Sequence, residues 1–171
     1  MDLDGWLSGL RTAEAAGTRR RTRWTAEQLA ESATLTGLLV DLAEQRCEIV
    51  VVTAAGRRTL VLRCVGLDFC AGVDRDRWVL IPLAAVAAVR TPSSLDRAGS
   101  DRPPALDATL AEALTDLLDD RPRLTVTLAS GEQAAGELRA VGADVVTLRG
   151  DETPPRWAHI ALARVADIIV R

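Results

Sequence analysis

The sequence predicts a mainly β protein of the α+β class, with two tandem halves that each hold a helix followed by five short strands, plus an N-terminal helical extension. Two observations predict this fold. One pattern occurs twice, since Arg63-Cys64-Val65-Gly66-Leu67-Asp68 is matched by Arg139-Ala140-Val141-Gly142-Ala143-Asp144. In each half, apolar residues recur first at the spacing of a helix and then at every second position, which is the spacing of a strand.

The match between the halves extends over most of their length. It holds at an offset of 75 residues from Thr34 to Gly56, at 76 residues through Asp68, and at 79 residues from Trp78 onward. The offset changes only where loops are expected, as in related domains that have diverged. A self-match in constant order predicts one structural unit present twice. The predicted divisions are a helical extension (1–33), a first unit (34–90), a linker rich in Pro and Ser (91–106) and a second unit (107–171).

Composition limits the class of protein. Each unit has about 60 residues, a size at which a lone core is marginal, so packing between units or between chains is expected. Hydrophobic residues make up 48% of the chain and aromatic residues only 3%, so the core must consist of Leu, Val, Ala and Ile. All 21 basic residues are Arg, yet the net charge is −3 and neither half is strongly basic, unlike a typical nucleic-acid-binding domain.

The sequence favours a cytoplasmic protein. Three cysteines without CxxC spacing indicate free thiols in a reducing compartment. No signal peptide is visible, because Asp2 and Asp4 precede any apolar run. The longest apolar run, residues 79–89, contains Pro82 and is too short to span a bilayer.

The expected elements follow from spacing and turn residues. Residues 3–16 carry one apolar helical stripe, and Thr25 with Gln28 has the spacing of a capping box. In the second unit Thr109 is a candidate N-cap for a helix, and Ser130-Gly131 is the first turn between strands. The strands are expected around residues 124–128, 136–140 and 146–148, then after the polar loop 149–155 as two short strands between residues 157 and 168. The first unit repeats this order from Thr34 onward.

This pattern resembles the Sm-like small β-barrel of the Sm, LSm and Hfq proteins. The best match is Val126-x-Leu128-x-x-Gly131-x-x-x-x-Gly136-x-Leu138-x-x-x-x-x-Asp144, followed by Trp157-Ala158-His159-Ile160-Ala161-Leu162. The whole chain also resembles a group of uncharacterised actinobacterial proteins with paired Sm-like halves, each ending in a run like Ile81-Pro82-Leu83-Ala84-Ala85-Val86. The resemblance covers residues 34–171 and implies two tandem Sm-like five-stranded barrels.

The resemblance also implies an assembly and a binding pocket. Sm-like proteins form rings of six or seven barrels in which the fourth and fifth strands of neighbours pair, and they bind single-stranded RNA. In that comparison Asp68 and Asp144 take the position of the acid in one RNA-binding loop, Arg149-Gly150 falls near the second, and His159 stands where Hfq has its His. The resemblance to the pocket is incomplete, because the chain has no Asn and has Ala158 where Hfq has Lys. We expect Trp78, Trp157 and Phe69 to be buried and therefore not to stack on bases.

No catalytic pattern is present in the sequence. It has no P-loop, no GxGxxG after a strand and no GxSxG. A single His, and three cysteines (Cys47, Cys64 and Cys70) without metal-ligand spacing, give no zinc site. Cys64 and Cys70 match Ala140 and Val146 and are expected to be small core residues. We expect a protein that is not an enzyme and needs no cofactor or metal.

Two hypotheses for function follow. In the first, exposed strand edges assemble the chain with copies of itself or with a partner protein, and no membrane is involved. In the second, the chain binds RNA or DNA through its only basic cluster, in which Trp24 could stack on bases. A solvated helical face with acidic neighbours explains the same cluster. The cluster is Arg19, Arg20, Arg21 and Arg23, and the residues assigned to the second hypothesis are these four with Trp24, Asp144, Arg149 and His159.

Overall fold

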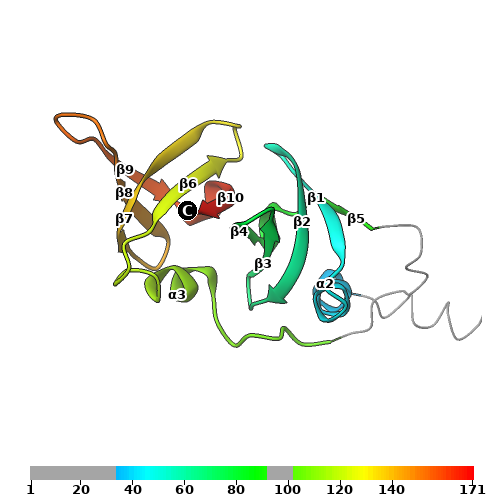
Figure 1. The fold of residues 1–171 in the computed structure, drawn as a ribbon. Coiled ribbons are helices and arrows are strands. Elements are labelled where there is room, and N and C mark those ends of the chain that lie inside the picture. The colour runs from blue at the N-terminus through cyan, green and yellow to red at the C-terminus, as the bar shows by residue number, and fades with distance from the viewer. Residues whose placement is uncertain (1–33, 92–101) are drawn as a thin grey trace, which may run out of the picture.

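The computed structural model describes residues 34–91 and 102–171, which form one antiparallel sheet of ten strands with two helices beside it (Figure 1). The prediction of a mainly β protein of the α+β class is confirmed. The sheet is open, with β5 at one end and β9 at the other. The predicted N-terminal extension, residues 1–33, lies outside the described residues.

Both halves have the same order of elements. In the first half, helix α2 (Leu35–Glu44) precedes β1 (Glu48–Thr53), β2 (Gly56–Val65), β3 (Phe69–Asp74), β4 (Arg77–Pro82), the 3-10 turn η1 (Leu83–Ala85) and β5 (Ala88–Arg90). In the second half, α3 (Leu110–Thr115) precedes β6 (Arg123–Leu128), β7 (Gln133–Val141), β8 (Val145–Arg149), β9 (Trp157–Ala161), η2 (Leu162–Arg164) and β10 (Val165–Val170).

Each helix begins at the threonine that the sequence indicates. Thr34 Oγ1 accepts a hydrogen bond from Gly37 N–H at 3.0 Å, and α2 ends before Arg46, whose φ of 51° is left-handed. Thr109 forms a capping box with Glu112 at the start of α3. The second helix stops at Thr115, earlier than its apolar stripe suggests.

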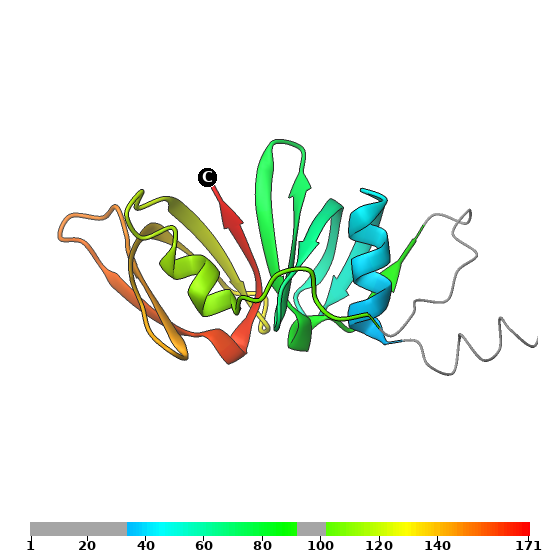
Figure 2. The same ribbon diagram turned by 90° about the horizontal axis from the view of Figure 1, so that it is seen from below.

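The strand order places the fifth strand of each half beside its first. The first half reads β5-β1-β2-β3-β4 and the second β10-β6-β7-β8-β9, and pairing of β4 with β10 joins them into one sheet. Gly56 and Gly131 turn the chain after β1 and β6 with positive φ angles of 135° and 89°, where a side chain would be strained. Viewed from below, the two curved sets of strands lie side by side, and the segment before α3 crosses from one to the other (Figure 2).

The boundary between the two cores does not coincide with the boundary between the halves. One core contains only first-half residues among its fully buried members, including Leu39, Ile49 and Ile81. The other combines second-half residues with Phe69, Ala71 and Leu80 of the first half. The halves therefore share apolar packing as well as backbone hydrogen bonds.

The expectation that both strand tryptophans are buried is wrong. Trp78 is 48% exposed and Trp157 is 52% exposed, whereas Phe69 is buried as expected. Side chains alternate along a strand, and Val79 and Ile81 face the first core, so Trp78 points away from it. Trp157 likewise lies on the face of β9 opposite to the buried Ile160.

Neither of the two helices in residues 34–91 and 102–171 is long and apolar enough to cross a membrane.

Candidate interface at the joint and the sheet edges

A β ladder forms the joint between the halves. Leu80 pairs with Ile168, Val79 with Ile169, and Trp78 with Val170. Leu80 belongs to the second core although it lies on β4 of the first half. Burial of a Leu or Phe side chain stabilises a fold by about 1.5–3 kcal/mol, so the residues shared between the halves make the joint strong.

A buried ion pair reinforces the joint. Arg58 of β2 donates from Nε to Asp167 Oδ2 and from Nη2 to Asp167 Oδ1 of β10, both at 3.0 Å. Thr127 Oγ1 donates to the same carboxylate at 3.0 Å and accepts from Arg58 Nη2 at 3.3 Å. The Asp167 side chain is only 3% exposed and that of Arg58 is 25% exposed. Because a shifted register would leave a buried carboxylate without its partner, this cluster fixes how the halves align.

The loop between β2 and β3 holds the start of α3. Asp68 Oδ1 accepts from Leu110 N–H at 2.6 Å, and Leu67 N–H donates to Ala108 O at 2.9 Å. A Cβ at Gly66 would lie 2.7 Å from Ala108 O and 2.2 Å from Phe69 Cε1, so only glycine fits this contact. A carboxylate at the first turn of a helix satisfies an N–H that has no partner within the helix. Asp68 therefore caps a helix of the other half.

The chain between the halves also contacts α2. Arg102 donates to Asp41 Oδ1 at 2.7 Å and to both carboxylate oxygens of Glu44. These hydrogen bonds lower the pKa of Glu44 and raise the pKa of the Arg102 guanidinium. Both groups are solvent-accessible, so the ion pairs orient the segment more than they stabilise it.

The two ends of the sheet are strand edges. Within residues 34–91 and 102–171, β5 pairs only with β1, and β9 pairs only with β8. Gly150 N–H donates to Arg156 O, and Leu162 N–H donates to Asp144 O. These two hydrogen bonds show which backbone N–H groups of β9 point toward β8, because the direction alternates from one residue to the next. The N–H groups of Trp157 and His159 consequently point away from β8. An edge of this kind can accept another strand.

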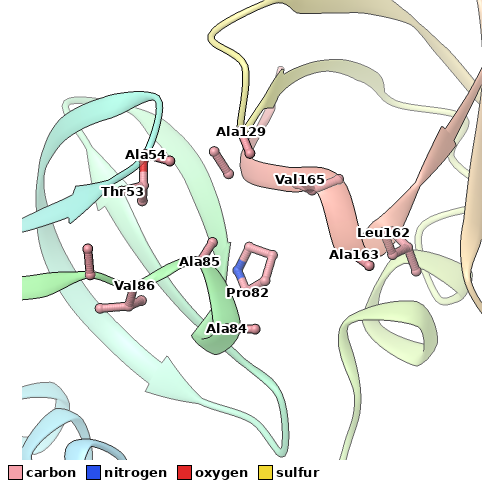
Figure 3. A pocket seen from close by; sticks show the side chains of 12 residues that line it. Thr53, Ala54, Pro82, Ala84, Ala85, Val86, Ala129, Leu162, Ala163 and Val165 are labelled. Atoms are coloured by element: carbon pink, nitrogen blue, oxygen red, sulfur yellow. The ribbon is translucent and has the colours of Figure 1, made fainter.

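A pocket of about 370 Å³ lies between η1 and the start of β10, where the halves meet (Figure 3). The lining consists of small residues and no titratable side chain. It comprises Thr53, Ala54, Pro82, Ala84, Ala85, Val86, Ala87, Ala129, Leu162, Ala163, Val165 and Ala166. Apart from the hydroxyl of Thr53, which donates to Gly56 O, this surface offers apolar contact and backbone groups, so it supplies no titratable acid or base.

The described residues of the nucleic-acid hypothesis do not form one cluster. Asp144 and Arg149 lie at opposite ends of β8, about 16 Å apart along an extended strand. His159 lies in the middle of β9, where its Nδ1 is 3.0 Å from Thr147 Oγ1. Near Arg149, the carboxylate of Asp151 pairs with Arg123, which lowers the pKa of Asp151. Arg19, Arg20, Arg21, Arg23 and Trp24 lie outside the described residues.

The cysteines are free thiols in the structure. Cys70 is fully buried, and burial raises the pKa of its thiol to about 12. Burial also raises the pKa of Cys64. No group of three or more His, Cys, Asp or Glu side chains that could hold a metal ion occurs in the part of the chain that the structure describes.

Sequence reasoning missed the ion-pair cluster at the joint. A signal for it was present, because Asp167 is the only charged residue in the run Val165–Val170. The corresponding residues in the other half are neutral, with Ala88 for Asp167, Gln133 for Arg58 and Val52 for Thr127. A charge that breaks an otherwise apolar repeat indicates a contact made in only one of the two units.

A comparison with protein-family models gave no match, and a comparison with proteins of curated function gave none either.

Proposed function

We propose that this chain is a non-enzymatic assembly module that binds copies of itself or a partner protein by adding strands to the edges of its sheet. The observation that carries the proposal is the joint. The fold already uses one edge-to-edge pairing, β4 with β10, and it leaves β5 and β9 at the ends of the sheet. Strand addition uses backbone hydrogen bonds for affinity and alternate side chains for specificity.

The strand order supports the further proposal that each half is an Sm-like barrel. Both halves begin with a capped helix and place the fifth strand beside the first, an order that a five-stranded barrel would also have. The joint also pairs the fourth strand of one half with the fifth strand of the other. Sm-like barrels use the same two strands to contact their neighbours, so this pairing favours assembly over catalysis.

The test uses the backbone direction of β9. In His159→Pro the outward-facing N–H is lost, while the N–H groups that pair with β8 are kept, and proline is tolerated at such edge positions. His159→Ala is the matched control, because it removes the imidazole and keeps the N–H. We expect the wild type and His159→Ala to associate as concentration rises in sedimentation velocity, and His159→Pro to associate much less. A wild type that stays monomeric and captures no protein would contradict the proposal.

Nucleic-acid binding is the second candidate, and the exposure of the two tryptophans favours it. Trp157 is 52% exposed and lies opposite Arg149 in the β8–β9 ladder, so an aromatic face and a cation are close together. An exposed Trp can stack on a base, with about 1–3 kcal/mol per base. We expect Trp157→Ala to weaken binding of a single-stranded oligonucleotide about tenfold or more if this candidate is right. Unchanged binding in Trp157→Ala, or no binding by the wild type, counts against it.

A further inference from the structure

We propose that residues 19–24 of this chain, which lie outside the described residues, bind in a groove between the two halves. In this arrangement Trp24 packs on the apolar surface of the groove, and the arginines of the segment pair with Asp68 and Asp144 at its side. The contact does not involve the strand edges, so it is independent of the proposed function.

The groove consists of two adjoining hollows, which together we call the inter-half groove. One is the pocket of about 370 Å³ described above, and the other, of about 560 Å³, lies among the β2–β3 loop, the β7–β8 loop and the start of α3. The hollows share Pro82 and Ala84 on one side and Leu162 and Ala163 on the other, as Figure 3 shows for the smaller hollow. Each has the volume of a typical ligand site, about 300–1,000 Å³.

Apolar side chains line most of the inter-half groove. The larger hollow adds Leu83 and Leu67, which is 49% exposed, to the alanine, proline and leucine surface of the smaller one. Exposed apolar side chains that are grouped in this way mark a binding surface, whereas single ones do not. A tryptophan that packs into such a surface can bury about 150–250 Å².

The charges of the groove specify what else its ligand must carry. Among the described residues that line it, the only charged ones are Asp68 and Asp144. Asp68 accepts from Leu110 N–H, whereas no described residue forms an ion pair with Asp144. An acidic groove repels phosphate groups and attracts cations. Arginine suits it best, because the planar guanidinium can donate two hydrogen bonds to one carboxylate.

Residues 19–24 of the same chain have the required composition. They contain four arginines, one tryptophan and no acid. The apolar stripe within residues 3–16 fits less well, because Asp2, Asp4 and Glu14 accompany it and would be repelled. Charge complementarity therefore selects residues 19–24 as the occupant.

The segment is near enough along the chain to reach the groove. Trp24 precedes Thr34 by ten residues, which can span up to about 33 Å. The strands from β5 to β10 are spaced by about 4.8 Å and extend over about 24 Å. In Figure 2 the start of α2 and the turns η1 and η2 lie along the same lower edge. A connection this short gives an effective concentration on the order of millimolar, so a weak contact is enough.

Protection of a thiol in the groove tests the proposal on the full-length chain. The background carries Cys47→Ala with Cys64→Ala and Cys70→Val, the last two taken from the other half. Ala163→Cys then places one thiol in the groove, and Asp76→Cys in a separate chain places a control thiol at the exposed β3–β4 turn, at the other end of β4 from Pro82. Intact mass spectrometry measures the rate of alkylation of each.

We expect the loss of the segment's side chains to expose the groove. Alanine at all four arginines and at Trp24 should raise the alkylation rate of Ala163→Cys at least fivefold and leave that of Asp76→Cys unchanged. A synthetic peptide of residues 17–26, added to this variant, should slow the reaction again. An equal rate at Ala163→Cys with and without these side chains overturns the proposal.

A charge exchange separates direct pairing from a general loss of structure. Glutamate at the four arginines should remove the protection of Ala163→Cys, and Asp144→Arg in the same chain should lower the rate again at least twofold. No recovery with Asp144→Arg overturns the pairing with Asp144. Protection that is lost on dilution means that a second copy supplies the segment, and protection that is lost after nuclease treatment means that nucleic acid covers the groove. Either result overturns the assignment to the chain's own segment.

Discussion

Replacement of Arg58 by methionine tests whether the ion pair at the joint holds the two halves together. Asp167 would lose two of its three hydrogen bonds and keep only that from Thr127. Removal of one partner from a buried pair costs about 3–5 kcal/mol. The Arg58 side chain is 25% exposed, so water reaches the site and the lower end of this range applies, about 3 kcal/mol. For a chain of this size the melting temperature should fall by about 6–12 °C.

Urea denaturation followed by far-UV circular dichroism measures the effect. Asp167→Ala should cost less than Arg58→Met, because the arginine left behind can turn toward water whereas the carboxylate cannot. The double variant should therefore lose about 2 kcal/mol less than the sum of the two single losses. Arg57→Met, one residue away on an exposed part of β2, is the control and should change stability by less than about 0.5 kcal/mol. A loss below about 1 kcal/mol in Arg58→Met, or strictly additive losses in the double variant, would refute this account of the joint.

Three further predictions concern single sites. Gly136→Ala should destabilise the fold by about 1–3 kcal/mol in the same assay, because its Cβ would lie 2.5 Å from Arg149 O; Gly142→Ala, whose nearest contact is a side-chain methyl at 3.0 Å, should cost less. Cys70 should resist alkylation in the native protein at pH 8, since its thiol has a pKa of about 12, and rapid native-state labelling detected by peptide mass spectrometry would contradict its burial. The N–H and hydroxyl of Thr109 lower the pKa of Glu112, so its contribution to stability is present above the ordinary pKa of 4.5 and is lost as pH falls through the lower folded-state value. Glu112→Gln should therefore reduce the loss of stability in acid, and identical acid-unfolding curves would argue against the capping box.

The fold could be predicted from the sequence to the level of element type and order, because those depend on local patterns. Thr34 and Thr109 cap helices where the spacing indicates, and the glycines at 56 and 131 turn the chain after the first strand of each half. Pairing between the halves could not be predicted in this way. It depends on contacts between residues more than 80 positions apart, such as Val79 with Ile169, and no local period carries that information.

The exposure of Trp78 was mispredicted for a related reason. Alternation along a strand states which residues share a face, but not which face meets a neighbour. Leu80 and Trp78 lie on the same outer face of β4, and only Leu80 is covered by the second half. The candidate interface has the same limit, since the sequence alone placed Asp68 and Asp144 at loops but could not show that Asp68 caps a helix of the other half.

A chain with two similar strand contacts, one within the chain and one between chains, should form the internal contact first. The neutral counterparts of the ion-pair cluster help to explain this order. The internal contact is favoured by connection through one chain, which gives it a high effective concentration. It also contains the Arg58–Asp167 pair, and a β10 strand placed against β9 of another copy would set Asp167 near Gln133 instead, with no cation to pair with it. A buried carboxylate without a partner is strongly unfavourable, so the mismatched pairing is disfavoured beyond the effect of connection alone. The neutral counterparts Ala88, Gln133 and Val52 place no carboxylate beside β5 or β9 that would need a buried partner, which suits a contact that forms between chains and depends on their concentration.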